Sequence, residues 1–168
     1  YSMTQNSEFI SKISDWINFN KQDDAKTLSL AQSPIIKQFR VYQKPLFRGC
    51  FISPEDIISL QKTKKIKLNK FTSWTKDEKI AKKFISDKKY MFKPTNNDHK
   101  RDSIPVIFKK TFNTSEIVVD IESIINFVGE DRLDLFGLSI IDYEVAIDEQ
   151  EVLVKPITVN KNEIISLI

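Results

Sequence analysis

The stretch that decides the fold is Leu46-Phe47-Arg48-Gly49-Cys50-Phe51-Ile52, near the end of the first third of a chain of 168 residues. It combines aromatic and branched apolar residues and is bounded by proline on both sides, which predicts the first strand of a sheet. Before it, apolar residues recur at helical spacing, and after it short apolar runs are separated by turn residues. The change predicts a helical N-terminal part, residues 1–44, and a strand-rich core, residues 45–168, within one domain.

Upstream of this strand, the pattern is helical. Residues 7–19 carry apolar side chains on one helical face, which predicts an amphipathic helix with a buried aromatic stripe. Two further helices are expected at residues 23–32 and 34–41, because Pro34 forces its preceding residue out of the helical region.

Downstream, short strands and short helices are expected. Helices should begin after Ser53, where proline and two acids follow an N-cap, after Thr75, which starts a capping-box sequence, and at residue 121. Strands are expected at residues 65–73, 104–112, 116–121, 149–156 and 163–168. In the first of these, lysines alternate with Ile66 and Leu68, which favours a strand with one wet face; a surface for an acidic partner is the alternative.

Helices gathered first and strands second indicate an α+β architecture rather than alternating βαβ units. The length fits a single folding unit. With three glycines in the whole chain and no glycine-rich phosphate loop, neither a Rossmann fold nor a P-loop is expected.

Composition limits the classes of function. The chain is 40% apolar and 29% charged, and no segment approaches the roughly 18 apolar residues of a membrane span, so no membrane partner is expected. A net charge of +3 gives no reason to expect nucleic acid. Cys50 and His99 are the only residues of their types, so we expect no internal disulfide, no metal site and no Ser-His-Asp relay.

Three short motifs stand at the ends of expected strands: Arg48-Gly49, Phe71-Thr72-Ser73-Trp74-Thr75 and Glu149-Gln150-Glu151. Each alone has an ordinary explanation, respectively a surface pair, a strand that runs into a helix cap, and one wet face of an edge strand. In this order and at these separations they resemble the arginine-specific mono-ADP-ribosyltransferases, a family of bacterial toxins and bacteriophage enzymes. The family pattern is an arginine on the first core strand, aromatic-x-Ser-x-Ser/Thr before a helix, and a later Glu-x-Glu.

The resemblance covers residues 47–154 and implies a fold. In that family, two facing, mainly antiparallel sheets form a cleft that holds NAD without a Rossmann motif, and a small helical region often precedes them. Trp74 stands where the family carries a small residue, so the resemblance requires that its side chain point away from the cleft.

The resemblance also implies a role for each motif residue. Arg48 would bind the NAD phosphates, and the backbone of Gly49 would face the nicotinamide carboxamide. Ser73 would orient Glu151, which would accept the 2′-hydroxyl of the nicotinamide ribose and, ionised, stabilise an oxocarbenium-like transition state. Phe84 falls where the family often places a ring against the nicotinamide; its alternative is an ordinary apolar helix residue.

On the acceptor side, the resemblance points to two residues. Glu149, expected on the same strand face as Glu151, would position the acceptor guanidinium and remove its proton. Family members that modify asparagine resemble this pattern with glutamine there, so Glu149 favours arginine. Tyr143 is the aromatic nominated for contact with the protein substrate, although residues 138–147 are apolar enough to form a strand.

We therefore expect a monomeric enzyme that transfers ADP-ribose from NAD, its substrate, to an arginine of a target protein and releases nicotinamide. The alternatives are hydrolysis of NAD, transfer to a nucleic acid or small guanidine, and a non-catalytic binding module. A single cysteine and the lack of a visible secretory signal favour work in the cytoplasm of a host or target cell. Expression from a phage and delivery as a toxin or effector stay open.

Overall fold

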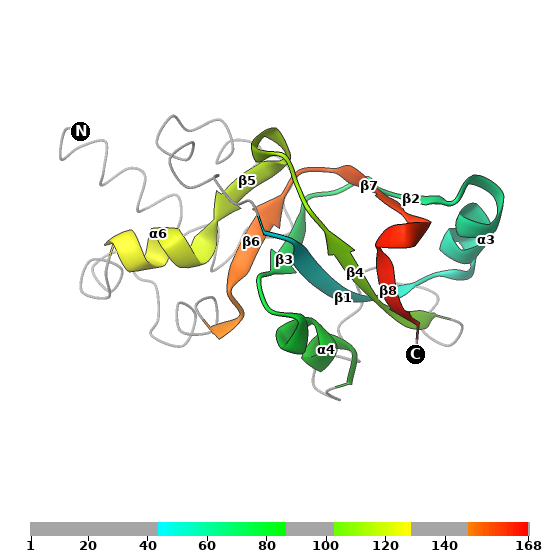
Figure 1. Cartoon of the computed structure of the whole chain (residues 1–168), viewed down its shortest axis with the longest axis horizontal. Helices are drawn as coiled ribbons and strands as arrows, with labels where there is room; N and C mark the ends of the chain where they lie inside the picture. The colour runs from blue at the N-terminus through cyan, green and yellow to red at the C-terminus, as the bar shows by residue number, and fades with distance from the viewer. Residues whose placement is uncertain (1–43, 87–102, 129–147, 168) are drawn as a thin grey trace.

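The computed structural model describes residues 44–86, 103–128 and 148–167, which form the strand-rich core (Figure 1). In chain order its elements are β1 (Leu46–Ile52), α3 (Pro54–Thr63), β2 (Lys65–Leu68), β3 (Thr72–Thr75), α4 (Glu78–Ser86), β4 (Ile104–Lys110), β5 (Ile117–Asp120), α6 (Ile121–Val128), β6 (Glu151–Val154), β7 (Ile157–Asn160) and β8 (Ile164–Leu167). The 3-10 turns η3 (Thr114–Glu116) and η4 (Lys161–Glu163) precede β5 and β8. The expected N-terminal helices, His99 and Tyr143 lie outside the described residues.

The strands form two sheets. Six of them are arranged in the order β5-β6-β3-β1-β4-β8, and β2 pairs with β7. Every pairing between them is antiparallel. The predicted α+β class is therefore confirmed for the described residues.

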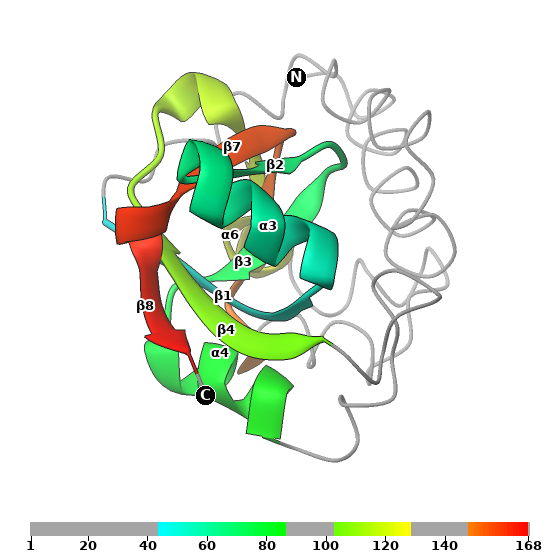
Figure 2. The same ribbon diagram turned by 90° about the vertical axis from the view of Figure 1, so that its right-hand side faces the viewer.

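The two faces of the six-stranded sheet are covered by different elements. In Figure 2, α4 lies on one side of the sheet, and α3 with the β2–β7 pair lies on the other. Strand β1 follows this division, because Leu46 and Ile52 join the main core cluster while Phe47 and Phe51 pack with Ala81 and neighbouring apolar residues. The alternation of side chains along a strand thus serves two separate layers.

The main core lies between the large sheet, α3 and the β2–β7 pair. Its centre is Trp74, whose ring stacks on Phe108 with centroids 6.2 Å apart and meets Phe112 edge-on at 4.8 Å. Ile66 of β2 and Val159 of β7 are each 1% exposed or less and close the cluster from the other side. Burial of these apolar side chains is the principal stabilising contribution to the core.

Helix α3 begins where the sequence predicts. Ser53 Oγ accepts a hydrogen bond from the backbone N–H of Asp56 at 3.2 Å, and Asp56 Oδ2 accepts one from the N–H of Ser53 at 3.3 Å. Pro54 occupies the first turn, and Lys64 ends the helix in the left-handed conformation with φ 59°. This reciprocal cap satisfies two helix-terminal donors that would otherwise lack partners.

Several expected boundaries were wrong. The single strand expected at residues 65–73 is two strands in different sheets, because the apolar alternation stops at Leu68 and Asn69-Lys70 breaks the run. Helix α4 is capped by Asp77 rather than Thr75, since Asp77 Oδ1 accepts from Lys79 N at 2.9 Å. Strand β7 was not predicted.

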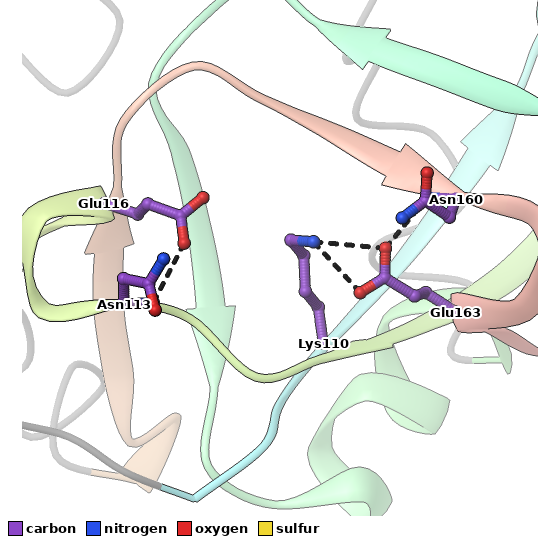
Figure 3. Close-up of polar contacts among 5 residues, drawn as sticks. All are labelled: Lys110, Asn113, Glu116, Asn160 and Glu163. Atoms are coloured by element: carbon purple, nitrogen blue, oxygen red, sulfur yellow. Dashed lines mark hydrogen bonds and ion pairs between the residues drawn. The ribbon is translucent and has the colours of Figure 1, made fainter.

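Both edge strands of the large sheet are preceded by the same type of turn (Figure 3). The carboxylate of Glu116 accepts a hydrogen bond from the N–H of Asn113 at 2.9 Å, and that of Glu163 accepts one from the N–H of Asn160 at 2.8 Å. Among residues 44–86, 103–128 and 148–167, a lysine ties only the second turn to the sheet: Lys110 Nζ lies 3.0 and 3.1 Å from the oxygens of Glu163.

Candidate active site

The central strands β1 and β3 are register partners at a single pair, Phe47 and Thr75, whereas β1 pairs with β4 along its whole length. Arg48 is the next residue of β1. Its Nη1 donates a hydrogen bond to the backbone carbonyl oxygen of Ser73 on β3 at 2.8 Å. The guanidinium therefore bridges the two strands where their ladder stops.

Ser73 also makes a side-chain contact with the third motif. Its Oγ donates a hydrogen bond to Oε1 of Glu151 at 2.7 Å, and Glu151 is only 4% exposed. Thr75 is the register partner of Glu151, and Ser73, two residues before Thr75, is that of Leu153. The side chains of Ser73 and Glu151 therefore lie on one face of the β3–β6 ladder. A hydroxyl donor at this distance from a carboxylate is a short, charge-assisted hydrogen bond.

The three motifs thus meet in space. Arg48 and Ser73 are 25 residues apart in the sequence, and Ser73 and Glu151 are 78 apart. Two hydrogen bonds nevertheless link the three residues, one from Arg48 to Ser73 and one from Ser73 to Glu151. They come from β1, β3 and β6, and the hydrogen bond expected between Ser73 and Glu151 is present. The chemical roles inferred for these residues remain predictions.

Arg48 leaves β1 on the face opposite to that of Ser73. Its register partner is Phe108, a member of the main core cluster, and Cys50 two residues on packs against the same cluster. Burial raises the pKa of the Cys50 thiol, and the neighbouring Arg48 charge partly opposes that rise. The Nε of Arg48 is buried and has no hydrogen-bond partner among residues 44–86, 103–128 and 148–167. The guanidinium therefore has donor capacity that these residues leave unused.

Gly49 has a purely structural reason to be glycine. A methyl group on its Cα would overlap the backbone carbonyl oxygen of Ala81 and would lie 2.9 Å from the carbonyl carbon. The missing side chain is what allows α4 to pack directly on β1. Phe84 lies half-buried on this helix, and Ala81 and Ile85 provide its buried face.

The expected geometry of Glu149 was wrong. Strand β6 begins at Glu151, and Glu149 lies in the preceding turn, where Gln150 adopts a left-handed conformation with φ 48°. The chain changes direction between the two glutamates, so strand alternation does not place them on one face. Glu149 is half-buried, and its proposed contact with an acceptor remains a prediction.

Trp74 points away from Ser73 and Glu151. It is 2% exposed in the main core cluster, and its Nε1 donates a hydrogen bond to Oγ1 of Thr72 on the same side of β3 at 2.8 Å. Trp74 and Arg48 therefore share one face of the sheet, and the expectation that Trp74 points away from an NAD cleft stays a prediction.

Sequence reasoning missed an ionic cluster beside these residues. Lys76, directly after β3, has its Nζ 2.7 Å from Asp120 Oδ2 and 3.6 Å from Glu122 Oε2. Asp120 Oδ1 also accepts a hydrogen bond from the N–H of Ser123 at 3.2 Å, which caps α6. In the sequence, Lys76 and Asp120 each stand just before an expected helix. Neither local pattern indicates that the two residues contact each other.

No group of three or more histidine, cysteine, aspartate or glutamate residues in the described segments is arranged to hold a metal ion. Within the same segments, no helix has the length and apolar character needed to cross a membrane. Comparisons of the chain with protein-family models, with curated proteins and with solved structures gave no match in any of the three.

Proposed function

We propose that this protein is a mono-ADP-ribosyltransferase that transfers ADP-ribose from NAD to an arginine side chain of a target protein. The observation that carries the proposal is the 2.7 Å hydrogen bond from Ser73 Oγ to a Glu151 carboxylate that is 4% exposed. The antiparallel arrangement of the two sheets is compatible with the ADP-ribosyltransferase fold that the motifs resemble.

The chemistry explains why such a carboxylate is useful. As the bond between ribose C1′ and the nicotinamide nitrogen breaks, the leaving group takes the bonding electrons and positive charge develops on the ribose. A fixed carboxylate held by a hydroxyl stabilises that charge, and its effect is larger away from water. Glu151 would also accept the 2′-hydroxyl of the same ribose.

Arg48 fits the role of an anion ligand. It is fixed at one end by its bond to the Ser73 carbonyl, while its buried Nε has no partner among the described residues. A guanidinium presents its N–H donors in a planar fork that matches the oxygens of a diphosphate. Binding of NAD phosphates to Arg48 is therefore part of the proposal.

In the transfer step, a guanidinium nitrogen of the target arginine forms a bond to ribose C1′ and loses a proton. We assign that proton to the carboxylate of Glu149. Nicotinamide leaves as a neutral molecule, because it recovers the electron pair of the broken bond. The products are nicotinamide and an ADP-ribosylated arginine.

Hydrolysis of NAD to free ADP-ribose is the second candidate, and one observation favours it. Glu151 is held in the sheet, whereas Glu149 lies in a turn before the strand. Water as the acceptor requires the site around Glu151 but no precisely positioned Glu149. A transferase to a nucleic acid or small guanidine would use the same Glu151 chemistry, and a non-catalytic binding module would use none of it.

The test is incubation with NAD labelled on its adenylate half and a cell extract. The native chain is compared with Glu149→Gln, Glu151→Gln and a control, Glu116→Gln, which alters a glutamate in the turn before β5. We expect labelled protein with the native chain and the control, and none with the other two variants. Assignment of the added ADP-ribose to an arginine side chain by mass spectrometry of the labelled peptides would identify the acceptor as arginine.

The other outcomes are distinct. Consumption of NAD without labelled protein, unaffected by Glu149→Gln, would support the hydrolase. Label on nucleic acid or on an added small guanidine would change the acceptor. If the native chain neither bound nor consumed NAD, the proposal would be wrong and a binding module would be the better account.

A further inference from the structure

The ion pair between Lys76 and Asp120 joins two strands that are not neighbours. Lys76 follows β3 directly, and Asp120 is the last residue of β5. In the sheet, β6 lies between these two strands. A contact of 2.7 Å between their side chains must therefore cross β6.

The register locates the crossing. Val152 on β6 is the partner of Trp74 on one side and of Asp120 on the other, and Glu151 is the partner of Thr75. The ion pair therefore passes the first residues of β6. Because Asp120 shares a face with Val152, the ion pair lies on the face of β6 opposite to the Glu151 side chain.

This end of β6 needs to be fixed. Glu151 is the first residue of the strand and follows directly on the left-handed Gln150. The ends of strands open more readily than their centres, and a reacting group loses effectiveness when it is displaced by a fraction of an ångström. Ser73 holds the side chain of Glu151, but a hydrogen bond at the carboxylate does not hold the backbone from behind.

The ion pair is built for a structural task. The side chains of Lys76 and Asp120 are 15% and 7% exposed, so their attraction is weakly screened by water. Asp120 uses its second oxygen to cap α6, and Glu122 from the first turn of that helix adds a carboxylate 3.6 Å from Lys76. The end of β3, the end of β5 and the start of α6 are thereby tied together around β6.

We propose that Lys76 and Asp120 are positioning residues that hold the start of β6, and with it Glu151, in the geometry that the reaction requires. This inference rests on the proposed function for its kinetic consequence, while its structural consequence is independent of NAD. Neither residue is assigned a contact with substrate.

The test uses Lys76→Met in the full chain, with Lys110→Met as the matched control. Among the described residues, Lys110 forms a second partly buried lysine pair, 3.0 Å from Glu163 with side chains 14% and 18% exposed, and it is on β4 rather than beside β6. Two properties are measured: NAD consumption as kcat and KM, and backbone amide exchange followed residue by residue by NMR.

We expect Lys76→Met to lower kcat by about tenfold or more, with KM for NAD changed less than about twofold, because positioning affects the reaction more than binding. Exchange at the amides of Glu151 and Val152 should rise by about tenfold relative to the rest of the core. Lys110→Met should show neither local effect, and Lys76→Arg should restore most of kcat. Should Lys76→Met fail to fold, Asp120→Asn serves in its place, since the amide oxygen can keep the α6 cap.

The two proposals fail separately. If the native chain consumes NAD but Lys76→Met matches Lys110→Met in both kcat and exchange, the positioning role is overturned and the enzyme stands. If the native chain consumes no NAD, the proposed function is lost, and the exchange of Glu151 and Val152 alone decides whether the ion pair holds β6.

Discussion

At the first two residues of β6, the two faces of the β3–β6 ladder are similarly buried and chemically opposite. One carries Trp74 at 2% and Val152 at 0% exposure, and the other carries Thr75 at 3% and Glu151 at 4%. Buried apolar groups stabilise the fold in any close-packed arrangement, whereas buried polar groups cost free energy unless each finds a partner. A single strand pair therefore separates stability from chemistry, and changes on the two faces should produce different losses.

The largest loss of stability is expected on the apolar face. Trp74→Ala removes the ring that contacts Phe108 and Phe112 and leaves a cavity, which should lower the free energy of unfolding by about 3–5 kcal/mol. Urea unfolding followed by circular dichroism measures it. A loss below about 1 kcal/mol would mean that Trp74 is not the centre of the core.

On the polar face, Glu151→Gln should do the reverse. Under the proposed function, NAD consumption should fall by about 100- to 1000-fold, because the neutral amide cannot stabilise positive charge. Its carbonyl oxygen can still accept from Ser73, so the free energy of unfolding should change by about 1 kcal/mol or less. The same urea experiment supplies this value, and an unfolded variant would contradict the separation of the two faces.

Gly49→Ala tests the packing of helix α4 on the sheet. The added methyl group meets the α4 backbone, and the resulting overpacking should cost about 2–3 kcal/mol of unfolding free energy. Because the overlap is with the carbonyl of residue 81 and not with its side chain, adding Ala81→Gly should not restore stability. Restoration in the double variant would show that the clash had been placed wrongly.

A smaller effect should separate the two Asn-x-x-Glu turns. Glu163→Gln weakens both the turn and a pair with Lys110 that is mostly shielded from water, and it should cost about 1–2 kcal/mol. Glu116→Gln affects an exposed turn and should cost about 0.5 kcal/mol. Thermal unfolding of both variants and of Lys110→Met would show a difference of several degrees, and equal shifts would contradict the role of Lys110.

The smallest effect concerns pH. Burial raises the pKa of the Cys50 thiol in the folded chain, so the folded state holds its proton more tightly than the unfolded state. The associated stability is complete below the unfolded pKa of about 8.5 and is lost as the pH rises toward the folded pKa, by at most about 1.4 kcal/mol per pH unit. Unfolding of the native chain and Cys50→Ala between pH 7 and pH 10 should show a steeper alkaline loss for the native chain; parallel curves would contradict it.

The sequence predicted well where the signal is local. The start of α3 depends on Ser53, Pro54 and Asp56, which lie within four residues of one another, and β1 and β4 are apolar runs with clear ends. The meeting of Arg48, Ser73 and Glu151 was also expected, but from a resemblance and not from any pattern in the strands. Without that ordering of motifs, nothing local brings residues 48 and 151 together.

The errors have a common physical cause, which is that chain direction is decided by contacts far away in sequence. Gln150 adopts a left-handed conformation that its residue type does not announce, so the start of β6 was placed too early. Asp77 rather than Thr75 caps α4, because Thr75 is committed to the ladder with Glu151. Lys76 and Asp120 each stand next to a helix start in the sequence. Their pairing exists only because the strands that lead to them, β3 and β5, both pair with β6.

The close packing of Gly49 on α4 has a consequence for any large-scale mutational survey of this chain. Position 49 should reject every side chain whether or not the protein ever meets NAD, because the helix backbone occupies the space. The loss of all substitutions at position 49 would reflect the packing of α4 on β1 and would give no information about a ligand. Arg48, one residue away and directed to the opposite face, is where the same survey would be informative: variants that accumulate normally in cells yet lose their biological effect would mark a selection imposed by chemistry.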